Sequence, residues 1–520
     1  MKMMKRKTLC FLLAAVLMVM MTACSSKSDS DSTNTNTQST TSADTSASTE
    51  NSVSAEPYEI YMTFMTLGMN HPDILKVQDA VNEITLKEIN TKVKLIPMSI
   101  FERENQVQLM IFTGEKLDLM MSTFNSGIGG YVNQGQLLPL DDLLAQYGSG
   151  IEEALGLIIA GGYYDGNLYA IPTAAKSGVE AGLIMRKDIA DKYGFTNTNA
   201  TYQELDDLFA KVKAGEGDNF YMFSIGGSNL TTYDVFGIYD KLGASEAAGV
   251  LMDGGRRDTT IVNLYATPEY KEHCQWMRKW YEAGYISKDV VTYAGNNNDL
   301  MQSGNYLCWP TFIEVDQVPS AALINGFDMI GVSLGGLTAT TDLYQTAMWT
   351  IPVTCKDPIT TFKLLNLMYT NKELCNLLSF GIEGEHYVKT DDPGIIRYPD
   401  GIDANNVGYF AFMFYGNNAT RHYMEPMDSG IFSELADFNA SITDAVASRA
   451  LGYTYNAKDM QTEFAAVNSV IAQYRASLES GAVDPDEVLP QFLSALQSSG
   501  IDKLIADNQQ QLDNWLSQQN

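Results

Sequence analysis

The residues Gly331–Gly335 (GVSLG) match the G-x-S-x-G pattern of a serine nucleophile, and Asp342 and His386 follow in the order of a hydrolase triad. In such a triad the histidine takes the hydroxyl proton as the serine attacks an acyl group. The pattern requires a strand, a sharp turn and then a helix. The continuation here, GLTATTDLY, is rich in threonine and has no helical spacing of apolar residues. The sequence therefore favours a strand at this position over a hydrolase nucleophile.

Carboxylates leave a second kind of enzyme open, a glycoside hydrolase, which needs two carboxyl groups at a set separation in space. The candidates are Asp118, Glu180, Asp234 and Glu314. Metal chemistry is not predicted, because the four histidines show no ligand spacing such as HExxH. We therefore expect neither a metal site nor a cofactor.

The N-terminus has the pattern of an export signal. Four cations within Lys2–Lys7 precede an apolar run, Leu9–Met21, that is too short to span a membrane comfortably. Small residues then lead to a cysteine in MTAC, which resembles a lipobox, where the thiol of Cys24 would be lipidated. The alternative is an ordinary secretory signal with an incidental cysteine. Residues 1–23 are thus predicted to be a lipoprotein signal peptide, and the protein to be anchored on the outer side of the cell membrane.

Composition separates a tether from a folded region. Residues 24–55 are almost entirely Ser, Thr, Asn, Asp and Ala, which predicts a disordered tether with a reach on the order of 30 Å. The remaining chain, up to residue 520, is too long for one core and predicts at least two lobes. The net charge of −29 disfavours nucleic acid and anionic lipid as partners. Membrane contact is therefore expected only through the lipid anchor.

Four cysteines follow the anchor, and most have large apolar neighbours. They are Cys274, Cys308, Cys355 and Cys375. We interpret them as small buried hydrophobic side chains, and a disulfide between them stays open.

Strands and helices alternate along the first part of the folded region. Apolar spacing predicts strands at 58–64, 93–97 and 117–121 and helices at 72–90 and 101–113. This order predicts right-handed crossovers and a mostly parallel sheet. Ligands of such sheets bind beyond the carboxyl ends of the strands. The loops Thr66–His71 and Ser122–Gly130 are therefore the first candidates for ligand contact.

A second α/β lobe is predicted from the same alternation further on. Its expected strands are 182–186, 220–224, 306–310 and 328–334, and the expected helices are 201–214, 268–283 and 358–369. From Asp459 the chain is predicted to be helical to its end, with stops at Gly481 and Gly500. The last helix should pack one apolar stripe against a lobe, formed by Ile501, Leu504, Ile505, Leu512, Trp515 and Leu516.

The stretch GGYYDGNLYAIP lies between the two predicted lobes. Its turn, Asp165–Asn167, predicts a hairpin at the edge of the first lobe. Ile171–Ala175 is predicted to cross into the second lobe, and Pro172 suits a place where ladder pairing ends.

Several motifs together resemble the extracellular solute-binding proteins of ABC importers, in the class that contains maltose-binding protein. The resemblance is carried by GEKLDLMMS with GQLLPLDDLL, by YYDGNLYAIPTAA with GLIMRKDIADKYGF, and by ATYQELDDLFAKVK. The segments FGIEGEHYVKT, TEFAAVNSVIAQYRASLESGAVDPDEVL and GIDKLIADNQQQLDNWL are similar to the C-terminal region of a lipoprotein subgroup that serves sugar and oligosaccharide uptake. Together these segments span nearly all of the chain after the tether.

The resemblance implies a two-lobed α/β fold with hinge strands, in which the lobes close on a ligand. Lobe 1 would comprise residues 56–172 and about 335–410, and lobe 2 residues 173–334 and about 411–520. It further implies a monomer without catalytic residues that binds a sugar or oligosaccharide and delivers it to permease subunits. A carbohydrate-active hydrolase, a binding protein for a peptide or another solute, and a surface adhesin or scaffold are the alternatives. The absence of internal repeats disfavours a scaffold.

Candidate ligand contacts follow from the strand ends where the family places its binding loops. In lobe 1 and the first crossing segment they are Thr66, Asn70, Ser122, Phe124, Asn125, Thr173 and Lys176. In lobe 2 and near the hinge they are Asn229, Tyr233, Trp309, Phe312, Glu314 and Trp349. A purely structural role is the alternative for several of them: Phe124 could pack under its own loop, Asn229 could cap a helix and Trp309 could be a core residue. Core packing is the favoured interpretation for Tyr409, Phe412 and Tyr415.

Overall fold

The computed structural model describes residues 56–66, 70–100, 102–123, 127–173, 175–226, 231–293, 295–411 and 414–519. The predicted signal peptide, Cys24 and the tether lie outside these residues, as do Phe124, Asn125 and Asn229. Within the described ranges, none of the helices combines the length and the apolar character needed to cross a membrane.

Two groups of strands, joined by one bridge, form the first sheet. Its strands are β1 (Tyr58–Thr66), β2 (Thr91–Ser99), β3 (Met120–Thr123), β6 (Ile171–Pro172) and β13 (Ala347–Thr350). β1 and β2 pair in parallel over nine residues each, and a parallel bridge joins β1 to the residue that precedes β3. β13 lies antiparallel between β3 and β6. The parallel arrangement predicted for the first three strands is confirmed, and β13, for which no strand was predicted, adds an antiparallel member.

The second sheet has the strand order β12-β7-β11-β8. Its strands are β7 (Val179–Arg186), β8 (Tyr221–Phe223), β11 (Tyr306–Ile313) and β12 (Met329–Thr338). β8 and β11 are parallel, whereas β7 runs antiparallel to both of its neighbours. β7 and β13 each reach their sheet from the other one. Each therefore enters its sheet at the end where the neighbouring strands finish, and β7 and β13 run antiparallel to those neighbours.

Helices pack on both sheets. With the first sheet lie α1 (Ile74–Ile89), α2 (Arg103–Thr113), α3 (Gly129–Asn133), α4 (Asp141–Tyr147), α5 (Ser149–Leu155), α13 (Pro358–Thr370) and α14 (Lys372–Phe380). With the second sheet lie α6 (Lys187–Lys192), α7 (Tyr202–Glu216), α8 (Tyr233–Phe236), α9 (Pro268–Glu282), α10 (Asn297–Gln302) and α11 (Gln317–Asn325). The bounds of the predicted long helices agree with these within two residues.

Local sequence explains where these helices begin and end. Thr201 and Glu204 form a reciprocal capping box at the start of α7, which satisfies backbone donors that would otherwise lack partners. α2 ends at Gly114, whose φ of 71° is a left-handed conformation that favours glycine. The end of this helix predicted at residue 113 is thus confirmed.

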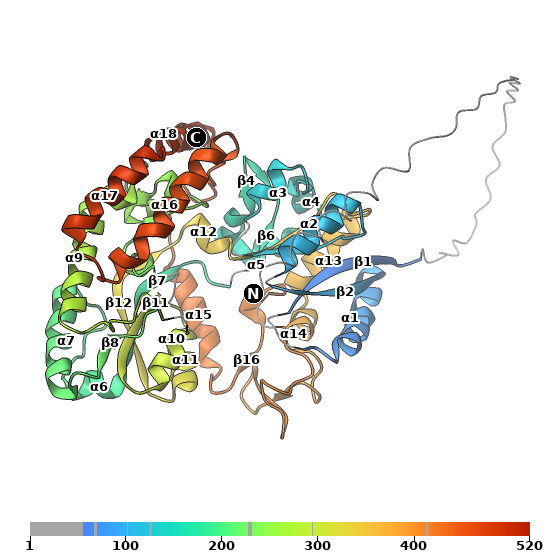
Figure 1. Cartoon of the computed structure of the whole chain (residues 1–520). Helices are drawn as coiled ribbons and strands as arrows, with labels where there is room; N and C mark the ends of the chain where they lie inside the picture. Colours follow the sequence, from blue (N-terminus) through green and yellow to red (C-terminus); the bar gives the residue numbers. More distant parts are fainter. Residues whose placement is uncertain are drawn as a thin grey trace, which may run out of the picture. The chain divides into compact units, whose positions relative to one another are not determined.

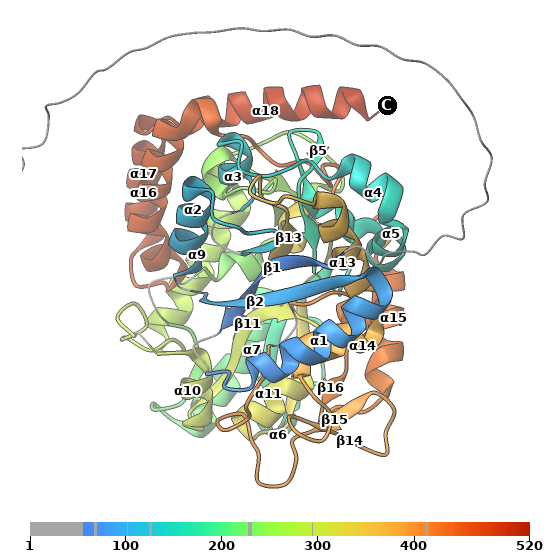
Figure 2. The same cartoon turned by 90° about the vertical axis from the view of Figure 1, so that its right-hand side faces the viewer.

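The C-terminal helices pack on the second sheet's side of the molecule. They are α16 (Gln461–Glu479), α17 (Pro485–Ser498) and α18 (Ile501–Gln518), and Figure 1 shows them in red beside α9. Figure 1 shows α16 and α17 side by side, and Figure 2 shows α18 running away from the upper end of this pair. The predicted stripe of α18 packs into one core with Tyr265, Phe492 and their neighbours. We call the first sheet with its helices lobe 1, and the second sheet with its helices and α16–α18 lobe 2.

Segments that cross between the lobes meet in one place. The first runs from Pro172 to Val179, and the second passes through α12 (Thr341–Tyr344) between β12 and β13. The third follows α15 (Gly430–Ser441), where Ala447 forms a bridge with Ala339. The hydroxyl of Tyr344 donates to the carbonyl of Ser177 at 2.5 Å, which ties the first two crossings together.

Short strands complete the structure. β4 (Tyr163–Tyr164) and β5 (Asn167–Leu168) form the predicted hairpin. Pro172 lies in β6, an edge strand of the first sheet, as predicted for a residue that cannot continue a ladder. The others are β9 (Tyr239–Asp240), β10 (Leu251–Met252), β14 (Val388–Lys389), β15 (Ile395–Arg397) and β16 (Tyr423–Met424). All four cysteines after the tether are buried and free, which confirms their interpretation as small hydrophobic side chains.

Candidate functional site

A cavity of ≈600 Å³ lies between the lobes, and we call it the interlobe cavity. The wall on the side of lobe 1 is formed by residues that follow β3, Gly127–Gly130 and Asn133, and by Tyr164 of the hairpin. The second crossing segment contributes Asp342, Gln345 and Thr346. Lobe 2 contributes Lys241, Gly243–Ser245, Thr454, Tyr455, Ala457, Lys458, Gln461, Phe464 and Asn468. The cavity is therefore bounded by both lobes and by a segment that joins them.

Polar side chains connect the two walls directly. The amide nitrogen of Asn133 donates to Tyr164 Oη at 3.0 Å and to Asn456 Oδ1 at 3.1 Å. Asn456 returns a hydrogen bond to Asn133 Oδ1 at 3.4 Å. Because Asn133 ends α3 in lobe 1 and Asn456 precedes α16 in lobe 2, this amide pair spans the lobes.

The wall of lobe 2 is backed by a buried group of charges, which we call the Arg475 cluster: Arg475, Lys241, Asp234, Glu246 and Glu479. Arg475 on α16 lies 2.7 Å from Asp234, 3.2 Å from Glu246 and 2.6 Å from Glu479. Burial alone would raise the pKa of the Asp234 carboxyl, but Arg475 and Lys241 lower that pKa below its usual value. The cluster fastens α16 to the body of lobe 2.

Two further carboxyl groups, one of which lines the interlobe cavity, interact electrostatically. Asp240 lies in β9 of lobe 2, fully buried, and Asp342 lies in the second crossing segment. Burial and the neighbouring Asp342 raise the pKa of Asp240 to about 7. Burial also raises the pKa of Asp342, although Lys241 opposes that rise. The protonation of this pair therefore couples a crossing segment to lobe 2.

A smaller cavity of ≈280 Å³ lies at the carboxyl ends of β8 and β11 in lobe 2. Phe312, a predicted contact, lines it together with Thr231 and Asp234. This is the edge at which parallel strands present ligand loops. Of the predicted residues that the structure describes, Phe312 is the one that lines either of these two cavities.

Lys176 and Glu314 meet in a second charged group, which we call the Lys176 cluster: Lys176, Glu314, Asp316 and Arg421. The ammonium of Lys176 forms ion pairs with Glu314 and, at 2.7 Å, with Asp316. Burial would lower the pKa of Lys176, but the two carboxylates raise it. The predicted contacts Lys176 and Glu314 thus lie together, and each neutralises the charge of the other.

The structure corrects the expectation for Trp349. Its side chain is 0% exposed, its indole nitrogen donates to the carbonyl of Phe414 at 3.1 Å, and its ring packs against Tyr415. Trp349 is therefore a core residue of lobe 1 and does not face a cleft. Alternation of strand faces does not reveal this, because both faces of β13 are covered.

Other predicted contacts also serve packing or backbone bonding. Tyr233 is buried against Tyr239 and Tyr270, and Trp309 is buried in a core with Ile184. Thr173 is buried and donates from both its backbone and its hydroxyl to the carbonyl of Ala347.

The remaining described candidates lie at strand ends of lobe 1. Ser122 is buried and its hydroxyl has no hydrogen-bond partner within the described ranges. Thr66 is half-buried at the end of β1, and Asn70 is exposed. Among the aromatic candidates for packing, Tyr409 and Tyr415 are buried, which confirms their interpretation as core, whereas Phe412 lies outside the described residues.

The serine motif and its partners do not form a triad. Gly331–Gly335 lies within β12, with Ser333 paired to Gly182 in the ladder, so the required turn into a helix is absent from this described strand. The strand that the sequence favoured is confirmed. His386 hydrogen-bonds Asp73 rather than Asp342.

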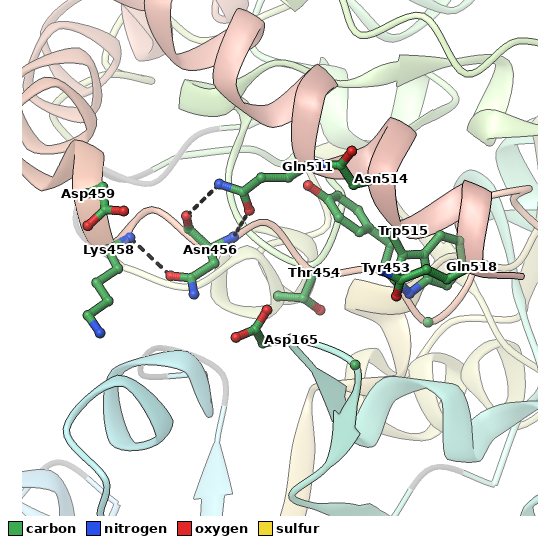
Figure 3. Close-up of a pocket in the computed structure, with 12 residues that line it drawn as sticks. Asp165, Tyr453, Thr454, Asn456, Lys458, Asp459, Gln511, Asn514, Trp515 and Gln518 are labelled. Atoms are coloured by element: carbon green, nitrogen blue, oxygen red, sulfur yellow. Dashed lines mark hydrogen bonds between the residues drawn. The ribbon is translucent and has the colours of Figure 1, made fainter.

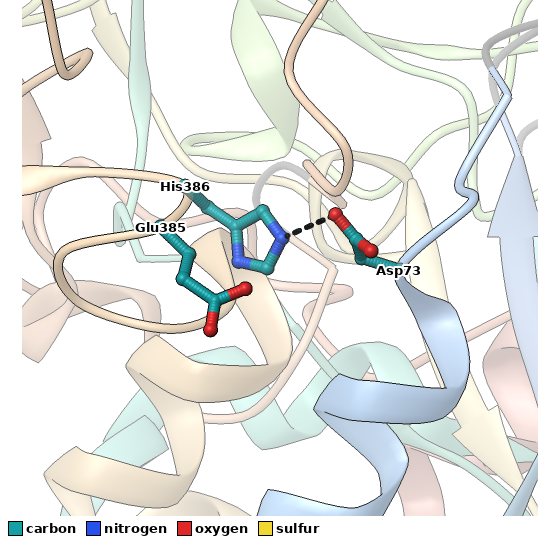
Figure 4. Close-up of side chains that lie close together, drawn as sticks. All are labelled: Asp73, Glu385 and His386. Atoms are coloured by element: carbon teal, nitrogen blue, oxygen red, sulfur yellow. Dashed lines mark hydrogen bonds and ion pairs between the residues drawn. The ribbon is translucent and has the colours of Figure 1, made fainter.

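His386, Asp73 and Glu385 lie close enough together to suggest a metal site (Figure 4). Nδ1 of His386 accepts a hydrogen bond from the backbone of Ile382, so Nε2 carries the proton and donates to Asp73 at 3.3 Å. The ammonium of Lys76 lies 3.0 Å from Asp73 and 3.0 Å from Glu385. Lys76 therefore already supplies the positive charge, and the histidine offers no free lone pair to an ion.

The residues that sequence reasoning missed come mainly from the C-terminal part. Gln461, Phe464 and Asn468 of α16 line the interlobe cavity, as do Tyr455 and Ser245. A signal was present, because positions i, i+3 and i+7 share one helix face and here combine two amides with an aromatic ring. That face could not be oriented toward lobe 1 without the tertiary structure.

Comparison with known proteins agrees with this arrangement. Residues 79–378 match the family described as bacterial extracellular solute-binding protein, and residues 449–517 match a domain of unknown function, DUF3502. A carbohydrate ABC transporter substrate-binding protein of Streptococcus pneumoniae serotype 4 is 25% identical over 451 residues, which are 84% of this chain and 87% of that protein.

Solved structures show the same fold. The N-glycan transport solute binding protein NgtS of Streptococcus pneumoniae has a TM-score of 0.77 at 23% identity, covering 89% of this chain and 100% of that one. Its complex with Man5GlcNAc has a TM-score of 0.66 at 23% identity, covering 89% and 99%. The mixed α/β, two-lobed fold and the family match over more than half of the chain lead to one conclusion: this protein belongs to the bacterial extracellular solute-binding proteins.

Proposed function

We propose that this protein captures an oligosaccharide between its lobes and delivers it to the permease subunits of an ABC importer, without catalysing a reaction. The observation that carries the proposal is the interlobe cavity of ≈600 Å³, bounded by both lobes and a crossing segment. Its volume lies in the range of small-molecule sites. A ligand held there would contact both lobes at once, and differential contact of this kind favours closure.

The lining supports a sugar as the ligand class. Tyr164, Tyr455 and Phe464 offer aromatic surface for the apolar faces of sugar rings, and amides such as Gln461 and Asn468 can bond hydroxyl groups. The relatives point the same way, since one is a carbohydrate transport protein and another was solved with Man5GlcNAc.

The division and anchoring of the chain belong to the same proposal. We assign residues 56–172 and about 335–410 to lobe 1, and 173–334 and about 411–520 to lobe 2. Packing of Tyr415 on Trp349 supports extending the second piece of lobe 1 by a few residues. Lipidation of Cys24 and a tether up to residue 55 would hold a monomer near its permease. The predicted loop contacts Thr66, Asn70, Phe124, Asn125 and Asn229 would complete the site.

A panel of sugars tests the proposal. Thermal shift is measured with monosaccharides, with Man1GlcNAc and with Man5GlcNAc, and the mixtures are then separated by chromatography. A ligand at one hundred times its Kd should stabilise the protein by about 2.7 kcal/mol and be recovered intact. Cleaved glycan would establish a hydrolase instead. A thermal shift with peptides and no shift with any sugar would show that the ligand is a peptide and not a sugar.

A further inference from the structure

A separate cavity of ≈380 Å³ lies beside the interlobe cavity, and we call it the α18 pocket. One side is the tip of the β4–β5 hairpin, at Asp165 and Gly166. The other side is formed by the 452–459 segment and by α18, which contributes Asn514, Trp515 and Gln518. Figure 3 shows Asp165 facing this second side across the opening. The pocket therefore lies between lobe 1 and the domain of unknown function.

Some lining groups are already committed to holding the pocket in shape. Gln511 accepts from the backbone of Asn456 at 3.2 Å and donates to its carbonyl at 3.0 Å, as the dashed lines in Figure 3 show. The hydroxyl of Thr454 accepts from Gln345 at 2.9 Å. These bonds fix the 452–459 segment between α18 and the second crossing segment.

Other lining groups remain available to a ligand. Within the described part of the chain, the side-chain polar groups of five lining residues form no hydrogen bond or ion pair: Asp165, Lys458, Asp459, Asn514 and Gln518. Trp515 lies among them, with its ring packed at 5.8 Å from that of Tyr453. An aromatic ring surrounded by amides and carboxylates matches the alternating apolar faces and hydroxyls of a sugar.

The two cavities adjoin each other. Thr454 and Lys458 line both of them. Along the hairpin, Tyr164 lines the interlobe cavity and the next residue, Asp165, lines the α18 pocket. The Asn133–Asn456 amide pair lies at this boundary, because Asn133 lines the first cavity and Asn456 the second. A chain molecule that fills the interlobe cavity can thus continue past Thr454 toward α18.

We propose that the α18 pocket is a second sugar subsite, in which the C-terminal domain binds the far end of an oligosaccharide too long for the interlobe cavity. This rests on the proposed function, since it assigns a second part of the same ligand. The domain of unknown function then has a role in selecting ligand length. A ligand there also touches the hairpin of lobe 1, so a longer sugar adds contacts between the lobes.

The test removes the free amides of α18. In the double variant Asn514→Ala/Gln518→Ala, both side chains are exposed and neither supports the fold through a side-chain bond within the described ranges. The matched control is Gln510→Ala/Gln519→Ala, which removes two exposed amides of the same C-terminal stretch that do not line the pocket. Affinities for Man1GlcNAc and Man5GlcNAc are measured by titration calorimetry on the wild type and on both variants.

The expected result is a selective loss. Two lost hydrogen bonds should raise the Kd of Man5GlcNAc about fivefold to fiftyfold in the test variant, with the Kd of Man1GlcNAc unchanged and the control like the wild type. An unchanged Kd for the longer glycan would overturn the subsite, and so would an equal loss for both glycans. If the wild type binds no sugar, the proposed function fails first and the subsite fails with it.

Discussion

Two charged clusters, one within lobe 2 and one that joins lobe 2 to the first crossing segment, use similar side chains in different surroundings. In the Arg475 cluster the side chains of Arg475 and Glu479 are 8% and 0% exposed, and all partners belong to lobe 2. In the Lys176 cluster Glu314 is 34% exposed whereas Lys176 and Asp316 are 13% and 14% exposed, and Lys176 comes from the first crossing segment. Buried charges cannot exchange partners with water without a large desolvation cost, whereas a partly exposed carboxylate such as Glu314 can. The first cluster therefore holds α16 in one position on lobe 2, and we call it the fixed joint. The second can rearrange when the crossing segment moves, and we call it the moving joint.

The largest effect is expected where the fixed joint loses its arginine. Arg475→Met leaves Asp234, Glu246 and Glu479 with too little positive charge, so the free energy of unfolding should fall by about 3–5 kcal/mol. Urea unfolding measures this. The control is Lys271→Met, which removes an exposed pair with Asp486 and should cost no more than about 1 kcal/mol. An Arg475→Met variant as stable as that control would contradict the role of a fixed joint.

A comparable loss is expected in lobe 1, where burial is equally complete. Trp349→Ala removes a fully buried indole and should lower the free energy of unfolding by about 3–5 kcal/mol. Trp349→Phe keeps most of the packing and should cost less. Urea unfolding compares the two. A stable Trp349→Ala protein with weakened ligand affinity would instead return this residue to the cleft.

The pair of carboxyl groups Asp240 and Asp342 gives a pH-dependent test. The folded pKa of Asp240 is raised to about 7, above its unfolded value, so the folded state keeps a proton that the unfolded state releases as pH rises. The contribution of Asp240 to stability should therefore fall between pH 4 and pH 8. Asp342 acts directly on Asp240, and Lys241 and Glu246 act on Asp342.

The Asp240→Asn variant has a neutral amide at this position, which does not titrate. Relative to the wild type, it should gain stability on the order of 2 kcal/mol at pH 8 and little at pH 4. Thermal unfolding of both proteins across this range is the measurement. Parallel pH profiles would show that Asp240 titrates normally in the folded protein.

A smaller effect is expected at the moving joint. Lys176→Met should lower the free energy of unfolding by about 1 kcal/mol, because Glu314 can turn to water and Arg421 remains 3.8 Å from Asp316. Added salt should shrink the part of this difference that comes from the Lys176–Glu314 pair, since Glu314 is partly exposed and therefore screened. The loss in Arg475→Met should persist at the same salt concentrations. Equal salt dependence of the two variants would remove the distinction between the clusters.

The smallest effect is expected at the amide pair that spans the lobes. Asn133→Ala removes about 1 kcal/mol of hydrogen bonding between Asn133 and Asn456, which shifts an opening equilibrium by about fivefold. Small-angle scattering of the ligand-free protein should show a larger mean radius of gyration. Asn167→Ala serves as the control, because this exposed hairpin amide donates to the carbonyl of Asp165 and makes no bond across the lobes among the described residues. Identical scattering from both variants would contradict a role in closure.

Local patterns predicted most elements but few of the contacts. The helix end at Gly114 and the hairpin at Asp165 depend on residues close in sequence, and both are confirmed. Trp349 was predicted to face the cleft from its place near the hinge. Its sequence position does not reveal that its indole donates to the carbonyl of Phe414. Lys176 lies in the first crossing segment, and the carboxylates that it binds lie 138 and 140 residues away in sequence.

The sequence by itself determined the alternation of strands and helices, the C-terminal helices with their apolar stripe and the likeness to solute-binding proteins. These depend on spacing, capping and motif order, which are local properties. Only the tertiary structure decided that β7 and β13 run against their neighbours, and that Tyr164 meets Phe464 across one cavity. Such facts depend on how the crossing segments set one lobe against the other. That arrangement is a balance of many long-range contacts, and no single segment contains it.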